Sequence, residues 1–242
     1  MMKKILVIGS NSFSGSSFVD YLPKNQYKIY YTSRTSSKSH FNKFNMNKKN
    51  VNFKKIDLSK DPNKLILWIK KIKPEFIINF VSESMVAESW IRPKDWYYLN
   101  SYILPVIYHE ISKFSFIKKF IHFSTPEVYG ATRENFKETN YFNPSTPYGV
   151  SRVTCDQVCN ILFITKKFPI IITRASNVYG EHQKLYRIIP KTIYSIITKK
   201  KLPLHGGGRS LRNFIHIDDV CKALIILLNK GINGETYHIS SK

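Results

Sequence analysis

Tyr148 and Arg152 are the residues of this 242-residue chain whose types and spacing most directly suggest chemistry. They lie four positions apart in Tyr148-Gly-Val-Ser-Arg152, a spacing that places two side chains on one face of a helix. A cation beside a phenol stabilises the phenolate and lowers the pKa of the phenol. The spacing therefore predicts a tyrosine that removes a proton from a hydroxyl group, with Arg152 lowering its pKa.

A second reactive segment, Ser124-Thr-Pro-Glu-Val-Tyr-Gly130, follows an apolar run that predicts a buried strand. In open α/β sheets, ligands bind at the carboxyl ends of the strands. If the strand continues through this segment, Thr125 and Glu127 point to the same side of it. The four catalytic candidates are therefore Thr125, Glu127, Tyr148 and Arg152.

A glycine-containing loop lies between the first expected strand and the helix after it, in Gly9-Ser-Asn-Ser-Phe-Ser-Gly15. Glycine lets the backbone approach a pyrophosphate, and the helix N-terminus adds N–H donors and a favourable dipole. Ser12 stands where a Gly-rich loop of this kind has its middle glycine, and serine fits there with a negative φ. We expect a dinucleotide to contact this loop at Gly9, Ser12, Phe13 and Gly15.

The end of the second expected strand bears on the choice of cofactor. An acidic residue there accepts a hydrogen bond from the ribose of NAD, whereas arginine accommodates the extra phosphate of NADP. The segment from Thr32 to Lys38 contains no acid, and Ser33, Arg34 and Lys38 suit a phosphate. The sequence favours NADP, with NAD as the alternative.

The elements that must position these residues alternate between short apolar strands and amphipathic helices, a pattern typical of a Rossmann-type, doubly wound parallel sheet. No internal repeat interrupts the alternation. We expect strands over 4–8, 28–32, 51–55, 76–80, 119–123, 170–174, 213–216 and 236–239, helices over 14–22, 62–72, 96–112, 147–163, 188–198 and 218–228, and a turn over 206–210.

The formal net charge of +22 would attract polyanions, including nucleic acid and anionic sugar nucleotides. Much of it is lysine scattered among many Ile and Asn residues, and all three have AT-rich codons, so a biased genome explains the charge and nucleic acid is not the expected partner. No apolar run approaches the roughly 20 residues of a membrane span. The first run, Ile5–Ile8, is too short for a signal peptide, so we expect a cytoplasmic protein. The three cysteines form no CxxC motif, which predicts buried free thiols and no metal site.

These motifs together resemble the extended short-chain dehydrogenase/reductase superfamily, in its NAD(P)-dependent sugar-nucleotide epimerase/dehydratase branch. The resemblance covers essentially the whole chain. It rests on the loop from Gly9 to Gly15, Asp57-Leu58, Asn100, the segments around Thr125 and Tyr148, Arg174-Ala-Ser-Asn177-Val-Tyr-Gly180, and Arg212-Asn-Phe-Ile-His-Ile-Asp218-Asp219.

The resemblance implies further site residues and a domain plan. Asp57, Leu58 and Ser124 join the expected cofactor contacts, together with Tyr148 and Arg152. Ser84, Asn177 and Arg212 are the expected substrate contacts, Arg212 through the diphosphate, which arginine binds bidentately. We expect a dinucleotide-binding domain over 1–178 and, interleaved with it, a small, apparently truncated C-terminal substrate lobe over 179–242. A homodimer is the expected assembly.

Within the branch, Ser82-Glu-Ser-Met-Val-Ala-Glu-Ser89 and Thr125-Pro-Glu-Val-Tyr-Gly130 resemble segments of the nucleotide-sugar 4,6-dehydratases. That likeness implies transient oxidation at C4, elimination of water across C5–C6 and return of hydride to C6. Thr125 would bind the sugar 4-hydroxyl, Tyr148 would take its proton, and Glu127 would take the proton from C5.

Two alternatives stay open. Pro126 stands where the dehydratases carry an acid, and a 4-epimerase or decarboxylase of the same branch does not need that acid. The lysine of the usual YxxxK motif is Arg152. That departure and the charge also leave open a non-catalytic or nucleic-acid-binding member that kept the fold.

Overall fold

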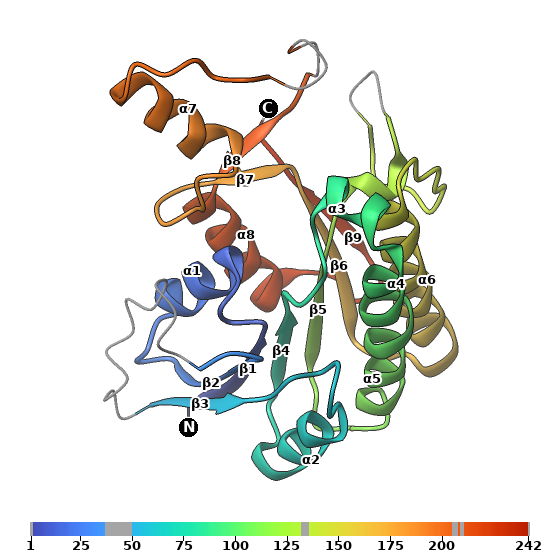
Figure 1. Cartoon of the computed structure of the whole chain (residues 1–242). Helices are drawn as coiled ribbons and strands as arrows, with labels where there is room; N and C mark the ends of the chain where they lie inside the picture. Colours follow the sequence, from blue (N-terminus) through green and yellow to red (C-terminus); the bar gives the residue numbers. More distant parts are fainter. Residues whose placement is uncertain (1, 37–49, 132–135, 205–207, 209–210, 242) are drawn as a thin grey trace.

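A seven-stranded parallel sheet forms the centre of the computed structural model, which describes residues 2–36, 50–131, 136–204, 208 and 211–241 (Figure 1). The strand order is β3-β2-β1-β4-β5-β6-β9. The order reverses between β1 and β4, and a crevice at the carboxyl ends of the strands is expected at such a point. The strands are β1 Lys3–Ile8, β2 Tyr27–Ser33, β3 Val51–Lys55, β4 Phe76–Asn79, β5 Lys119–Ser124, β6 Ile170–Ala175 and β9 Thr236–Ile239.

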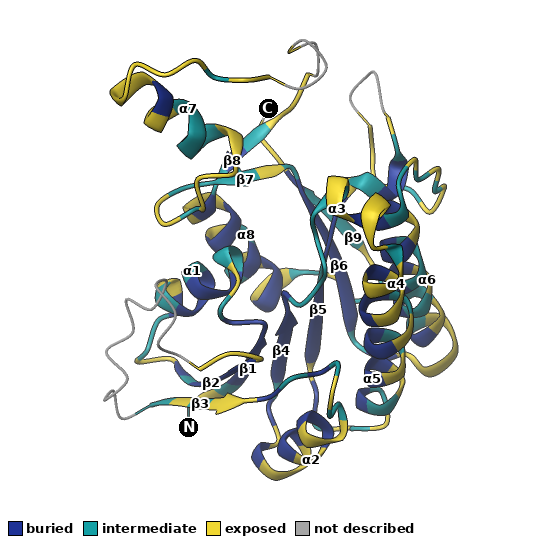
Figure 2. Ribbon diagram, in the orientation of Figure 1, coloured by how far each residue is buried: buried dark blue, intermediate teal, exposed yellow. Residues whose placement is uncertain are grey.

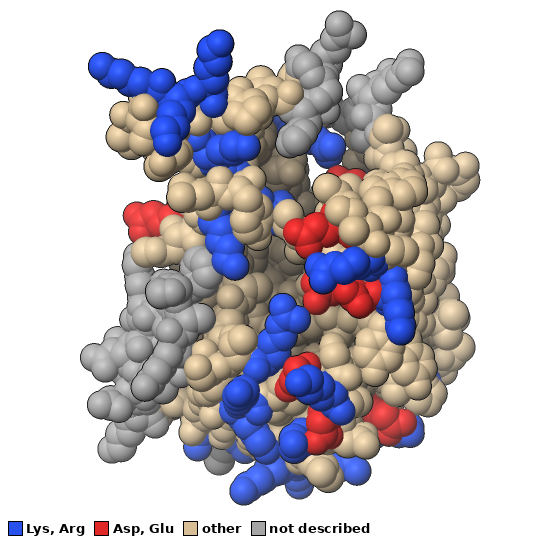
Figure 3. Space-filling view, viewed as in Figure 1, with Lys and Arg blue, Asp and Glu red and all other residues tan. Residues whose placement is uncertain are grey.

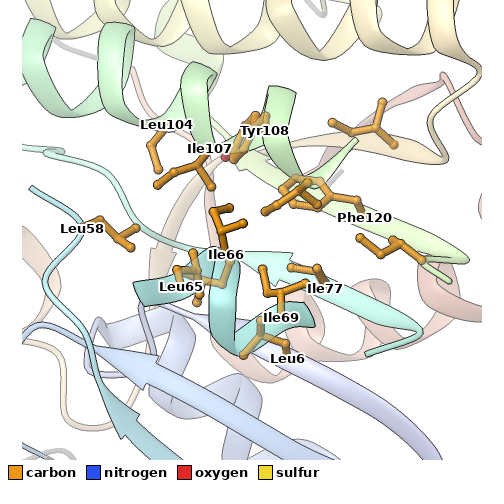
Figure 4. Packing of buried hydrophobic residues seen from close by; sticks show 14 of the residues in the cluster. Leu6, Leu58, Leu65, Ile66, Ile69, Ile77, Leu104, Ile107, Tyr108 and Phe120 are labelled. Atoms are coloured by element: carbon orange, nitrogen blue, oxygen red, sulfur yellow. The ribbon is translucent and has the colours of Figure 1, made fainter. Parts of the chain in front are cut away.

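Helices cover both faces of this sheet, and Figure 2 shows the strands between them as largely buried. Strand β1 is apolar on both sides: Leu6 and Ile8 belong to one buried cluster, Ile5 and Val7 to the other. This double burial is why parallel strands read as continuous apolar runs. Helices α1 (Phe13–Tyr21) and α8 (Ile217–Lys230) cover one face, and α2 (Asn63–Ile72), α5 (Leu104–Ile111) and α6 (Pro147–Lys166) cover the other (Figure 4).

The long helix expected over 96–112 is present as one unbroken helical run over 93–111, but its middle is a π-helix, which the sequence did not predict. Helix α4 (Pro93–Trp96) leads into a π-helix, η1 (Tyr97–Ile103), and then into α5. Pro105 lies in the first turn of α5 and has no N–H to donate to the preceding turn, which favours a widened turn there. Helix α3 (Val86–Ile91), which the apolar pattern did not predict, precedes them.

The chain after residue 176 contributes to two sheets. Strand β7 (Asn177–Tyr179) pairs in parallel with β8 (Phe214–His216), and α7 (Ile188–Ile197) lies between them in sequence. Strand β9 returns to the main sheet beside β6. The turn expected at 206–210 and Lys38 lie outside the described residues, apart from Gly208.

A helix that crosses a bilayer must be both long and apolar. Across the described ranges, no helix meets both requirements for crossing a membrane. The three cysteines, Cys155, Cys159 and Cys221, are buried free thiols, which confirms that expectation.

Candidate active site

A cavity of about 380 Å³ opens at the carboxyl ends of β1, β2 and β4. This is the crevice where the strand order reverses. Its lining brings together six residues that the sequence predicted as cofactor contacts, namely Gly9, Ser12, Ser33, Arg34, Asp57 and Leu58.

The glycine-containing loop has the tight geometry that a phosphate loop needs. Gly9 has φ +85°, and a Cβ built on Gly15 would lie 2.3 Å from the Gly9 carbonyl oxygen, so both positions require glycine. Ser12 has φ −71°, which confirms that serine fits there. Its hydroxyl donates to Gly9 O at 2.7 Å and accepts from Gly15 N at 3.1 Å, which caps α1 just before Phe13. The loop thus fits a pyrophosphate at the N-terminus of α1.

Arg34 has a partner that the sequence did not reveal. Its guanidinium Nη1 lies 3.4 Å from Glu83 Oε1, and both residues line the cavity. The neighbouring backbone is held by Asn11, whose Nδ2 donates to Thr35 Oγ1 at 2.7 Å. Because the Arg34 side chain is largely exposed, an ion pair of this kind contributes at most about 1 kcal/mol, so a ligand phosphate can compete for it.

The reactive segment after β5 is a turn rather than a continued strand, so alternation along a strand does not explain how Thr125 and Glu127 lie. Strand β5 ends at Ser124, and Pro126–Tyr129 form a 3-10 helix. Thr125 Oγ1 accepts from Glu127 N at 3.2 Å and caps that turn. Glu127 is half-buried, and its Oε1 lies 3.2 Å from Arg212 Nη1. The turn thus directs the glutamate toward the segment that precedes β8.

Tyr148 lies in the first turn of α6, which begins after a capping residue. Thr146 Oγ1 accepts from Gly149 N at 3.0 Å, and Tyr148 itself is buried. Burial raises the pKa of Tyr148, while the Arg152 charge and a hydrogen bond with Thr125 act to lower it. Arg152 therefore acts in the expected direction, but burial outweighs it. The network places Thr125, Tyr148 and Arg152 in one site.

Arg152 is buried, with 1% of its surface exposed. Only part of its guanidinium group contacts protein partners. Its Nη2 donates to Phe123 O at 2.7 Å and lies 3.1 Å from His122 Nε2. Its Nε and Nη1 are buried without a partner among the described residues. Two orphaned charged donors beside Tyr148 fit ribose hydroxyls, so the residues present suit the ribose end of a dinucleotide.

The three predicted substrate residues lie in three separate segments of the chain. Ser84 is half-buried in the loop before α3. Asn177 is exposed, and its Nδ2 donates to Asn213 O at 3.1 Å, which joins β7 to the segment before β8. The structure brings only Arg212 of this group into contact with a catalytic candidate.

Asn100 connects two parts of the site from within the π-helix. It is fully buried, and its Nδ2 donates to Glu83 O at 2.9 Å and to Ser151 Oγ at 3.0 Å. Its Oδ1 accepts from Glu83 N at 3.1 Å. The sequence singled out Asn100 and the segment around Glu83 through the family resemblance, but it gave no sign that the two residues are in contact.

Comparison with a family model places the chain among known proteins. Residues 5–240 match the model described as the NAD dependent epimerase/dehydratase family. The chain therefore belongs to that family, within the extended short-chain dehydrogenase/reductase superfamily.

The curated relatives are longer than this chain. It is 34% identical over 179 residues to dTDP-D-glucose 4,6-dehydratase of Mus musculus, covering 74% of this chain and 50% of the relative. The Dictyostelium discoideum protein of the same name is 31% identical over 99% of this chain and 58% of its own. The chain thus spans about half the length of the curated relatives it matches.

Solved structures share the same architecture. A dTDP-glucose 4,6-dehydratase from Bacillus anthracis in complex with NAD has a TM-score of 0.86 and 30% identity, with 98% of this chain and 75% of that chain covered. A UDP-glucuronic acid 4-epimerase from Bacillus cereus, in complex with UDP-glucuronic acid and NAD, has a TM-score of 0.89 and 24% identity, with 99% and 78% covered. The second likeness bears on the fold alone.

Proposed function

We propose that this member of the epimerase/dehydratase family binds a nicotinamide dinucleotide and acts on a nucleotide-linked sugar as a 4,6-dehydratase. The observation that carries the proposal is the convergence of Thr125, Tyr148 and Arg152 in one site, in a chain whose crevice is lined by six of the expected cofactor contacts. Glu127 stands at the same edge of the sheet. A nicotinamide held by these residues would supply hydride transfer from the sugar and back to it.

The roles of the side chains are those that the resemblance to the 4,6-dehydratases implies. The Thr125 hydroxyl binds the sugar 4-hydroxyl, and Tyr148 takes the proton of that hydroxyl as C4 is oxidised. The resulting ketone acidifies C5, and Glu127 takes the C5 proton while water leaves from C6. Pro126 has no proton to give, so a bound water must assist the departure of the C6 hydroxyl.

A 4-epimerase or decarboxylase of the same family is the second candidate. Its support is Pro126, which lies exposed at the start of the 3-10 turn and would not hinder a reaction that needs only Thr125, Tyr148 and the cofactor. Mass spectrometry after incubation with a panel of nucleotide sugars separates the reactions. Loss of water marks a dehydratase, a new isomer of unchanged mass marks an epimerase, and loss of carbon dioxide marks a decarboxylase.

A nucleic-acid-binding role is disfavoured by how the charges lie. On the face in Figure 3, Lys and Arg side chains are separated into several groups, and Asp and Glu side chains lie between them. Tight RNA binding that falls steeply with salt would overturn this part of the proposal.

NADP is the cofactor that we propose, with NAD as the alternative. Arg34 at the cavity supports NADP because its ion pair with Glu83 is exposed and can be exchanged for a phosphate. NAD remains the alternative because it is the nucleotide bound in the Bacillus anthracis relative. Affinities for the two nucleotides, measured side by side, test this choice.

We further propose a division into a dinucleotide-binding part, 1–178, and an interleaved substrate lobe within 179–242. Arg212 supports it, because it reaches Glu127 from that second region. We also propose a homodimer through η1, α5 and α6, whose outer surfaces expose large apolar side chains. These are Tyr102, Val106, Ile161 and Ile164. Light scattering on the purified chain tests the dimer, and Ile164→Glu should yield monomers.

A further inference from the structure

His122 is a fully buried imidazole that the proposed reaction does not use directly. It lies on β5, two residues before Ser124, and its side chain points toward α5 and α6. Its Nδ1 lies 2.7 Å from Tyr108 Oη, and its Nε2 lies 3.1 Å from Arg152 Nη2. Tyr108 belongs to the packed layer between the sheet and its helices (Figure 4).

A second group competes for the same imidazole nitrogen. Asp156 Oδ1 lies 3.3 Å from His122 Nε2 but is without a hydrogen-bond partner among the described residues. The other oxygen, Asp156 Oδ2, accepts from Arg174 Nε at 3.0 Å and from Arg174 Nη2 at 2.8 Å. Arg174 thus pairs with Oδ2, while His122 and then Arg174 act to lower the pKa of the Asp156 carboxyl, so both residues stabilise its charge.

One imidazole nitrogen cannot accept from Arg152 and donate to Asp156 at the same time. Guanidinium nitrogens only donate, so the contact with Arg152 requires Nε2 without a hydrogen. The proton of the neutral ring must then lie on Nδ1, and Tyr108 Oη would accept both from His122 Nδ1 and from Asn79 Nδ2, which lies 2.7 Å away. A contact with Asp156 would require the opposite tautomer.

We propose that His122 is a positioning residue of the site: it accepts a hydrogen bond from Arg152 and, together with the Phe123 carbonyl, fixes the guanidinium so that Nε and Nη1 remain for the ligand. Burial, followed by the charge of Arg152, lowers the pKa of His122 to about 4. The ring is therefore neutral near pH 7, as an acceptor must be. The contribution of His122 to ligand binding rests on the proposed function, whereas its tautomer is a property of the ligand-free chain.

The division of labour within Arg152 explains how arginine can serve at this position. A lysine offers one compact ammonium, but the guanidinium offers five N–H donors in a rigid plane. Nη2 contacts two groups in the protein interior, Phe123 O and His122 Nε2. The two orphaned nitrogens keep the charge beside Tyr148.

The first test is a nitrogen-15 NMR measurement of the His122 tautomer in the full ligand-free chain at pH 7. The wild type should show the proton on Nδ1. In Arg152→Met the competitor for Nε2 is gone, so the proton should move to Nε2 and face Asp156. A wild-type ring protonated at Nε2 would overturn the proposal, because Arg152 would then be a neighbour without a hydrogen bond.

A matched pair of variants tests the consequence for the ligand. His122→Gln keeps an acceptor in the side chain, whereas His122→Phe keeps an aromatic ring and removes the acceptor. With Arg152 released, the apparent pKa of Tyr148 should rise by about one unit or more in His122→Phe, and dinucleotide binding should weaken about tenfold. His122→Gln should keep the pKa of Tyr148 and the dinucleotide affinity close to their wild-type values.

Equal losses in the two variants would assign His122 a purely structural role. Titration of Tyr148, measured as the difference in ultraviolet absorbance between each form and the same form carrying Tyr148→Phe, and dinucleotide binding by fluorescence need no sugar substrate. An Nδ1–H ring with recovery by glutamine, but no turnover of any nucleotide sugar, would leave this inference standing and reject the proposed function.

Discussion

Arg212 Nη1 lies 3.2 Å from Glu127 Oε1, although the two residues are 85 positions apart in the sequence. The contact joins the segment before β8 to the 3-10 turn after β5. In the proposed reaction Glu127 is the base and Arg212 binds the substrate diphosphate. The proposed substrate must therefore draw Arg212 toward its phosphates and leave the carboxylate free to reach C5.

Arg212→Ala should weaken nucleotide-sugar binding. A charge-assisted hydrogen bond to phosphate contributes about 1.5–3 kcal/mol, so the dissociation constant should rise by about tenfold or more in calorimetry. Lys222→Ala is the matched control, since it removes an exposed cation that pairs with Asp219 on α8. Equal dissociation constants for the two variants would mean that Arg212 acts only through the overall electrostatic field of the protein.

Arg34→Ala should reduce affinity for NADP more than affinity for NAD. The loss should be about 1–3 kcal/mol for one charge-assisted hydrogen bond, measured by fluorescence titration with each nucleotide. Glu83→Gln removes the present partner of Arg34 and should shift the ratio toward NADP. If the wild type binds both nucleotides equally well, Arg34 does not recognise the phosphate.

The pH dependence of the rate should follow the ionisation of Tyr148. Burial raises the pKa of Tyr148 despite the opposing Arg152 charge. The phenolate is then a minor species at neutral pH, so kcat/KM should rise with pH from about 6 to 9. Arg152→Ala should lose most activity and move the rise to higher pH, whereas Arg152→Lys should retain a measurable share. An unchanged profile in Arg152→Ala would show that the protein does not activate its tyrosine through this cation.

Substitutions of Ser12 should separate its contribution to capping α1 from its contribution to dinucleotide binding. Ser12→Ala removes the hydroxyl that caps α1 and should lower the free energy of unfolding by about 1 kcal/mol, whereas Ser12→Gly should cost only a few tenths of a kcal/mol. Dinucleotide affinity should survive in Ser12→Gly. Chemical denaturation and nucleotide titration measure the two effects, and equal destabilisation by both substitutions would exclude the capping explanation.

The strands could be predicted because residues buried on both faces of the sheet are apolar and form continuous apolar runs in the sequence. The positions of side chains that depend on tertiary contacts could not be predicted. The strand at 119–123 does not extend to Glu127, because Pro126 begins a 3-10 turn. The partners of Arg34 and Arg212 lie 49 and 85 residues away, and local spacing carries no information about such pairs. The same holds for His122, whose neighbours come from α5 and α6.

The place of β9 in the sheet has a consequence for how the protein is made. Strand β9 pairs with β6 from Ile172–Thr236 to Ala175–Ile239, yet it is translated after the other six strands. Until it emerges from the ribosome, β6 is an open edge that begins with three isoleucines. Exposed apolar edges are templates for association with other chains. The nascent protein should therefore be prone to aggregation in the interval between synthesis of β6 and arrival of β9, and slowing translation there should lower the yield of folded protein.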